Sequence, residues 1–66
     1  MSIGENIRRI RLKKDITQAD LARRVGISQP MLAMIERGTK TVSLPLSKDI
    51  ADVLGCSIEA LIDETA

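Results

Sequence analysis

The sequence predicts a small all-α fold of five short helices, and three observations predict it. Hydrophobic residues make up 44% of the 66 residues, yet none is aromatic, and the alternating β-branched runs of strands are nearly absent. Apolar residues instead recur at the spacing of one helical face. Hydroxyl residues precede these segments and glycines follow several of them, as at helix starts and stops. Residues 1–66 are therefore expected to form a single domain, which buries only about 60% of the surface of its unfolded chain.

The first helix is expected over residues 4–14, with Ser2 as its cap. Its inward stripe consists of Ile3, Ile7, Ile10 and Arg11. The basic residues Arg8, Arg9 and Lys13 point elsewhere, so this helix is expected to be packed on one face and basic on the other.

Residues 17–37 predict two short helices separated by a tight turn. Thr17 caps the first helix and Gly26 ends it, because glycine readily adopts the left-handed conformation of a helix stop. Ser28 caps the second helix, which ends at Gly38. The buried residues of the pair are Leu21, Ala22 and Val25, followed by Leu32 and Ile35. Two such helices around a glycine indicate a helix-turn-helix.

Two further helices are expected after residue 42. Ser43 caps the first of them, and Pro45 lies in its first turn, where a missing amide hydrogen costs little. Its buried stripe is expected to be Leu46, Ile50, Val53 and Leu54. After a stop at Gly55, Ser57 caps a last short helix, whose apolar residues are Ile58, Leu61 and Ile62.

The charge of the chain is divided unevenly along its length. Residues 1–40 carry nine Lys or Arg against four Asp or Glu, a net charge of +5, whereas residues 41–66 carry one against five, a net charge of −4. A chain polarised in this way can present one face to a polyanion and turn the other away from it. The alternative is that solvated helix faces merely differ in sign.

The composition argues against catalysis. The sequence has no histidine, no spaced cluster of metal ligands, no nucleophile beside a base and no glycine-rich phosphate loop. Asp49 and Asp52, three residues apart on one helix, are interpreted as part of a solvated face. We therefore expect no enzyme activity, no cofactor, no metal and no small-molecule ligand. The lack of aromatic residues also disfavours single-stranded nucleic acid as a ligand.

Cys56 is the single cysteine, so no internal disulfide is expected, and its apolar neighbours suggest a buried side chain. The sequence contains no recognisable signal peptide or membrane span. A cytoplasmic location is expected, at the nucleoid if the protein binds DNA.

Several motifs follow one another through nearly the whole chain. They are Ile7 and Arg11, Ile16-Thr17-Gln18, Leu21-Ala22, Val25-Gly26, Ser28-Gln29, Leu32, Ile35-Glu36-Arg37-Gly38, Ala51, Leu54-Gly55 and Leu61. Together they resemble the helix-turn-helix DNA-binding family of phage repressors and Cro proteins, the lambda-repressor-like domains. The resemblance implies a compact five-helix fold in which helices 2 and 3 form the motif. It further implies a sequence-specific transcriptional repressor that binds a palindromic double-stranded operator as a homodimer, with helix 3 in the major groove.

The resemblance places base contacts at Gln29, Pro30, Met31 and Met34. Only Gln29 can both donate to and accept from adenine, whereas the apolar residues can touch thymine methyl groups. Much of the specificity is therefore expected from sequence-dependent DNA shape. The alternatives are that Gln29 is only a polar residue in a first helical turn and that the methionines fill the core. Helical spacing favours contact with DNA for Met34 and does not decide between DNA contact and a core position for Met31.

Phosphate contacts are expected at helix starts and just after the second motif helix. The free amide hydrogens at a helix amino terminus attract phosphate, and the helix that begins after Thr17 offers such a terminus. Arg23 and Arg24 are interpreted as solvated. The residues expected to contact phosphate are Gln18, Ser28, Arg37, Lys40, Thr41 and Ser43.

Arg11 and Glu36 both fall on inward faces, where a lone charge would be costly. The resemblance implies that they form a structural ion pair, which ties the first helix to the DNA-reading helix and does not itself contact nucleic acid.

A dimer contact is expected at Leu44, Leu46, Ile58, Leu61 and Ile62. The alternative for the last three is that they belong to the core of a single chain. A rival function is a protein-interaction module of the same fold, such as an antitoxin or an assembly adaptor, that presents acidic residues 49–64 to a partner chain.

Overall fold

A computed structural model of the chain describes residues 2–62, and every regular element in that range is a helix. The elements are α1 (Ile3–Lys13), α2 (Gln18–Val25), α3 (Gln29–Arg37), α4 (Leu44–Leu54) and α5 (Ile58–Ile62). The expected all-α fold of five helices is confirmed. The first helix begins and ends one residue earlier than predicted, because Ser2 caps a turn that already includes Ile3.

Each helix begins at a hydroxyl side chain that satisfies a free amide, as the sequence predicts. Ser2 forms a reciprocal cap with Glu5: the Ser2 hydroxyl accepts from the Glu5 amide, and the Glu5 carboxylate accepts from the Ser2 amide, both at 3.2 Å. Hydrogen bonding of Ser2 to the Glu5 carboxylate, first by its backbone amide and then by its side chain, lowers the pKa of Glu5 from its ordinary value of 4.5. Thr17, Ser28, Ser43 and Ser57 accept in the same way at the starts of the other helices.

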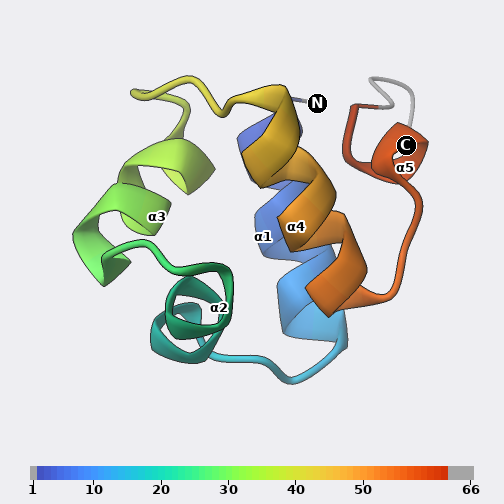
Figure 1. Cartoon of the computed structure of the whole chain (residues 1–66), viewed down its shortest axis with the longest axis horizontal. Coiled ribbons are helices and arrows are strands. Elements are labelled where there is room, and N and C mark those ends of the chain that lie inside the picture. The colour runs from blue at the N-terminus through green and yellow to red at the C-terminus, as the bar shows by residue number, and fades with distance from the viewer. Residues whose placement is uncertain (1, 63–66) are drawn as a thin grey trace.

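The helices pack around a central pair in a body of 28 × 23 × 20 Å. Figure 1 shows α1 and α4 in the middle, with α2 and α3 on one side and α5 on the other. α1 contacts α3, α4 and α5, while α2 packs against both α3 and α4. The motif helices are thus supported from behind by the two longest helices of the fold.

The core is built from aliphatic side chains of all five helices. Its members are Ile7, Ile10, Leu21, Ala22, Leu32, Ile35, Ile50, Ala51, Leu54 and Leu61. Leu61 has no exposed surface, so it contributes to the core of its own chain and cannot contact a second one from this position. The expected dimer contact is therefore wrong for Leu61, whereas Leu44 and Ile62 are 62% and 55% exposed.

Two small residues of α1 have roles that the sequence analysis missed. A Cβ atom built on Gly4 would lie 2.0 Å from the carbonyl oxygen of Ile35, so only glycine lets α1 approach the last turn of α3 this closely. Asn6 is fully buried, and its Nδ2 donates to the Leu61 carbonyl at 2.8 Å, which fastens α5 to α1.

Candidate nucleic-acid interface

α2 and α3 are joined by residues 26–28 alone. Gly26 has a φ of 77°, and its amide closes α2 by donating to carbonyls of the last turn. Ile27 packs against the core, and the Ser28 hydroxyl accepts from the Met31 amide at 3.2 Å to start α3. This connection holds the two helices in a helix-turn-helix.

The outer side of α3 carries the residues expected to read bases. Gln29 and Pro30 are exposed at the start of the helix, and Met34 is 36% exposed one turn further on. Met31 is half-buried and packs against the core, so it lies between the inward and outward faces of α3. Helical spacing alone could not decide between these two faces for Met31. The outward surface of α3 is therefore mostly apolar, with Gln29 as its polar residue at the amino terminus.

The residues expected to contact phosphate lie around this surface. Gln18 is half-buried at the first position of α2, and the others are exposed: Ser28, Arg37, Lys40, Thr41 and Ser43. The Thr17 hydroxyl accepts from the Asp20 amide at 3.0 Å, which leaves the first amides of α2 for another acceptor. The hydroxyls of Ser28 and Ser43 accept from helix amides, so each can offer only its own hydrogen to a phosphate.

Arg11 and Glu36 form the ion pair that the resemblance implies. Arg11 donates from Nε and Nη2 to the two carboxylate oxygens of Glu36, at 2.8 and 3.0 Å. The side chains are only 8% and 2% exposed, and Arg11 Nη1 also donates to the Ile16 carbonyl at 2.9 Å. Because every charged group here has a partner, burial of the pair is tolerated, and it connects α1 with α3.

Two glutamines extend this ion pair to the surface, an arrangement the sequence analysis did not foresee. Gln18 Nε2 donates to Glu36 Oε1 at 3.2 Å, and Gln29 Nε2 donates to Gln18 Oε1 at 3.5 Å. The three residues come from the start of α2 and from both ends of α3. No local pattern could have shown this contact, because it depends on how the two helices are packed.

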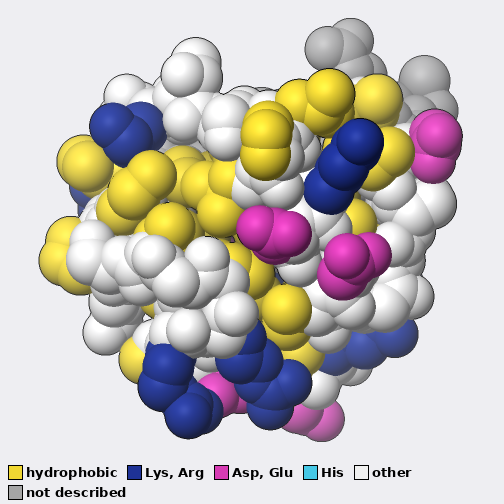
Figure 2. Space-filling model, viewed as in Figure 1, with side chains coloured by type: hydrophobic (Ala, Val, Ile, Leu, Met, Phe, Trp, Pro, Cys, Tyr) yellow, Lys and Arg dark blue, Asp and Glu magenta, His cyan; other side chains and the backbone are white. Residues whose placement is uncertain are grey.

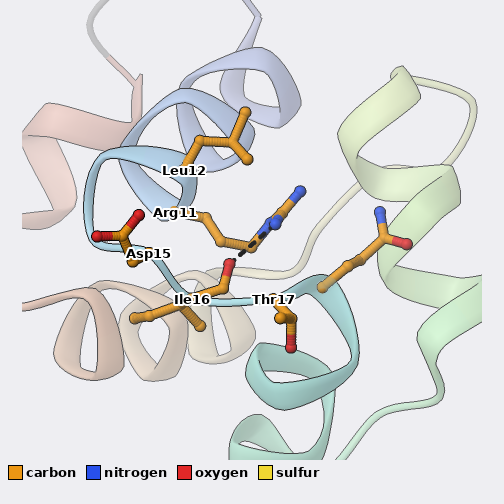
Figure 3. A pocket seen from close by; sticks show the side chains of 6 residues that line it. Arg11, Leu12, Asp15, Ile16 and Thr17 are labelled. Carbon is orange, nitrogen blue, oxygen red and sulfur yellow. Dashed lines mark hydrogen bonds between the residues drawn. The ribbon is translucent and has the colours of Figure 1, made fainter.

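A shallow open pocket of about 400 Å³ lies beside the ion pair. Figure 3 shows its wall, where the Arg11 side chain reaches across to the Ile16 carbonyl between Leu12, Asp15 and Thr17. Its lining is completed by Gln18, so the pocket is continuous with the amino terminus of α2. Asp15 has a φ of 57°, which turns the chain sharply from α1 into α2.

The surface is divided in type as well as in charge. In Figure 2 hydrophobic side chains cover much of the α3 side, Lys and Arg gather at the lower end over α2, and Asp and Glu lie over α4.

On α2 both Arg23 and Arg24 pair with Asp20. The pKa of Asp20 is lowered: partial desolvation raises it, but the hydrogen bonds and charges of the two arginines outweigh this. The arginines are exposed surface residues, as predicted.

Within residues 2–62, no three His, Cys, Asp or Glu side chains are close enough together to hold a metal ion. The helices of the same range are too short or too polar to cross a membrane.

Two short capped helices joined by a tight turn, the second exposed along an apolar and amide-bearing face, form a helix-turn-helix of the kind that DNA-binding proteins use. A family model described as "Helix-turn-helix" matches residues 7–61. The chain belongs to this family, and to the phage repressor and Cro type within it.

Three relatives illustrate the family. The immunity repressor protein of Bacillus phage phi105 is 34% identical over 64 residues, which are 97% of this chain and 44% of the relative. Antitoxin PezA of Streptococcus pneumoniae is 39% identical over 62 residues, 94% of this chain and 39% of the relative. The chain thus spans less than half the length of either. The solved P22 c2 repressor, in complex with a synthetic operator, superposes with a TM-score of 0.87 at 30% identity, covering 96% of both chains.

Proposed function

We propose that this chain is a transcriptional repressor domain that binds a palindromic double-stranded operator as a homodimer, with α3 in the major groove. The observation that carries the proposal is the exposed amino-terminal face of α3, with Gln29 beside the open start of α2. The P22 c2 repressor, whose fold is so similar, was solved with an operator.

Base reading is assigned to the exposed side of α3. The major groove is wide enough to admit an α-helix, and a glutamine amide matches adenine there by donating to N7 and accepting from N6. Pro30 and Met34 offer only apolar surface, which suits thymine methyl groups. Met31 can contribute only its exposed edge, because the rest of its side chain packs on the core.

Phosphate binding is assigned to both sides of α3. The open amides at the start of α2 and the Gln18 side chain face one strand, while Arg37, Lys40, Thr41 and the hydroxyls of Ser28 and Ser43 extend the contact along the backbone. Contacts of this kind position a protein on DNA without selecting a sequence.

A dimer is proposed because one short helix reads few base pairs, whereas two-fold pairing places two copies about 34–36 Å apart on one face of the duplex. The exposed Leu44 and Ile62, with half-buried Leu46 and Ile58 beside them, provide the apolar surface for that contact. Sedimentation of the free chain and of its operator complex tests this. A strict monomer in both states would contradict it.

DNA binding itself is tested by fluorescence anisotropy with a random-sequence duplex. A DNA-binding chain shows weak affinity that falls steeply between about 50 and 200 mM salt, because phosphate contacts release counterions. The similarity to antitoxin PezA keeps a protein-interaction module as the second candidate. That module, if it never contacts DNA, would show no anisotropy change at either salt concentration.

The reading residue is tested by Gln29→Ala on an operator selected from a random duplex library. We expect a loss of about 1–3 kcal/mol on the selected site and relaxed preference at one base pair in each half-site. Affinity for random duplex serves as the control and should be unchanged. An equal loss on all sequences would instead assign Gln29 to a phosphate.

A further inference from the structure

Leu12 is an exposed apolar side chain of α1 without a role in the proposed DNA complex. Half of its surface, 50%, is exposed. The other large apolar side chains exposed in residues 2–62 are Met34, which is proposed to contact bases, and Leu44 and Ile62, which are proposed to form the dimer. α1 contacts α3, α4 and α5 through its buried side, so the side that carries Leu12 is left to solvent.

The face of α1 around Leu12 is positively charged. Arg8, Arg9 and Lys13 lie on it, and none of them forms an ion pair within residues 2–62, whereas both arginines of α2 pair with an aspartate. Arg9 is half-buried: its Nη2 donates to Asn6 Oδ1 at 3.5 Å, and its buried Nε has no hydrogen-bond partner. The protein thus leaves the guanidinium groups of this face with hydrogens to offer to the carboxylates of another molecule.

Two open hollows meet at Leu12, which lines both of them. The larger, of about 400 Å³, extends from Leu12 to Gln18 at the start of α2 (Figure 3). The smaller, of about 330 Å³, extends along α1 to Arg8, Arg9 and Glu5, whose carboxylate already accepts a hydrogen bond from the start of the helix. Leu12 therefore stands between two hollows that can each receive an apolar side chain.

We propose that this face of α1 binds an acidic amphipathic helix of a second protein, whose apolar side chains lie on both sides of Leu12 and whose carboxylates pair with Arg8 and Arg9. Helices pack by placing the side chains of one between those of the other, and a leucine between two hollows allows this. An apolar centre with a charged rim is typical of protein interfaces. A nucleic acid backbone, which offers phosphate and sugar, would leave Leu12 without an apolar partner.

The position of the larger hollow connects this docking face with DNA binding. The hollow is lined by Gln18, where the proposed function places a phosphate. A helix that lies beside Leu12 would occupy this space, and its carboxylates would repel the DNA backbone. The bound partner therefore displaces DNA. This displacement rests on the proposed function, whereas the docking face does not.

The test begins with a library of random helix-forming peptides displayed on phage. Peptides that bind the wild-type chain are kept, and those that also bind the Leu12→Ser variant are removed. We expect the enriched peptides to combine Asp or Glu with two large apolar residues on one helical face. Enrichment of basic or uncharged peptides, or no enrichment, would overturn the proposal.

An enriched peptide is then titrated by fluorescence anisotropy. Arg8→Ala/Arg9→Ala should weaken its binding about tenfold or more, because a few central residues carry most of the affinity of an interface. The matched control is Arg23→Ala/Arg24→Ala, which removes the same charge from α2 and should weaken binding less than about threefold, because salt screens distant charges. Equal losses would reveal general charge attraction and contradict a defined docking site. Circular dichroism verifies that each variant is folded.

A last titration adds random-sequence duplex DNA to the peptide complex. The duplex should displace the peptide, and a complex that holds both would overturn the displacement. A wild type without salt-dependent DNA binding would remove the proposed function and leave the docking face in place. If Arg8→Ala/Arg9→Ala weakened binding of duplex as much as binding of peptide, the face would belong to DNA. If Leu12→Ser sedimented more slowly than the wild type, it would belong to a second copy of the chain.

Discussion

α1 is attached to α3 and to α5 in two different ways. Its contact with α3 depends on directional groups, the Arg11–Glu36 ion pair and the close backbone approach at Gly4. Its contact with α5 depends on burial of the apolar Leu61 and includes the hydrogen bond that Asn6 donates to the Leu61 carbonyl. The helix proposed to read DNA is thus fixed in position and rotation, whereas the terminal helix is mainly held by apolar contact.

The two contacts differ in how strictly they fix the position of the attached helix. The free energy of apolar burial is roughly proportional to the buried area and does not depend on direction. The apolar contact of Leu61 therefore tolerates small shifts of α5. A two-point ion pair with a fixed geometry tolerates much less, because a shift would separate one oxygen from its donor. The two-point ion pair therefore restricts the helix proposed to read DNA more than the Asn6 hydrogen bond restricts α5.

The largest expected effect comes from breaking the α1–α3 contact with Glu36→Ala. The variant leaves the buried Arg11 charge without a partner, and we expect a loss of about 3–5 kcal/mol in the free energy of unfolding. Urea or thermal denaturation measures it, with Arg11→Met/Glu36→Met as control, which should recover most of the loss. A wild-type stability for Glu36→Ala would show that the pair is solvated in solution.

A smaller effect is expected from Asn6→Ala on the α1–α5 side. The Leu61 carbonyl loses its donor inside the protein, at a cost of about 1–3 kcal/mol. Hydrogen exchange should show faster opening in α5 than in α3, because only the terminal contact is weakened. Equal acceleration in α3 would mean that the two contacts are not independent.

The smallest effect concerns the start of α1, where Ser2 and Glu5 form the reciprocal cap. The pKa of Glu5 is lower in the folded protein, so its contribution to stability is present above about pH 4.5 and is lost as the pH falls through the folded pKa. Glu5→Gln should therefore be slightly less stable than the wild type at pH 7, with the gap closing below pH 4.5. Thermal denaturation of both proteins between pH 7 and acidic pH measures this difference in stability. A difference that grows as the pH falls would contradict the role of Glu5 in the cap.

The helices were predictable because the signals that start and stop them are local. Each helix follows a hydroxyl residue, and Gly26, Gly38 and Gly55 end three of them in the left-handed conformation. The exposed side of α3 could likewise be inferred from the spacing of Leu32 and Ile35. The identity of the operator, by contrast, depends on contacts with DNA that no helical pattern contains.

What the sequence did not reveal depends on distant partners. Asn6 is buried where α5 packs against α1, and its acceptor, the Leu61 carbonyl, lies 55 residues away in the chain, so the local sequence around Asn6 does not indicate its burial. Leu61 and Ile62 are adjacent in a helix of five residues, too short for a pattern to decide which one faces inward. The contact of Gln18 with Glu36 depends in the same way on packing between elements.

Gly4 lies outside the proposed DNA interface, yet its close approach to α3 links it to the position of that interface. Any side chain at that position would have to push α1 and the last turn of α3 apart by about an ångström or more, because the Ile35 carbonyl occupies its place. Because Arg37 follows Ile35 in the same turn, a shift of that turn would also move Arg37 relative to the start of α2. A substitution at residue 4 would therefore alter the α1–α3 spacing, and with it the proposed reading surface, while every side chain proposed to touch DNA stays the same.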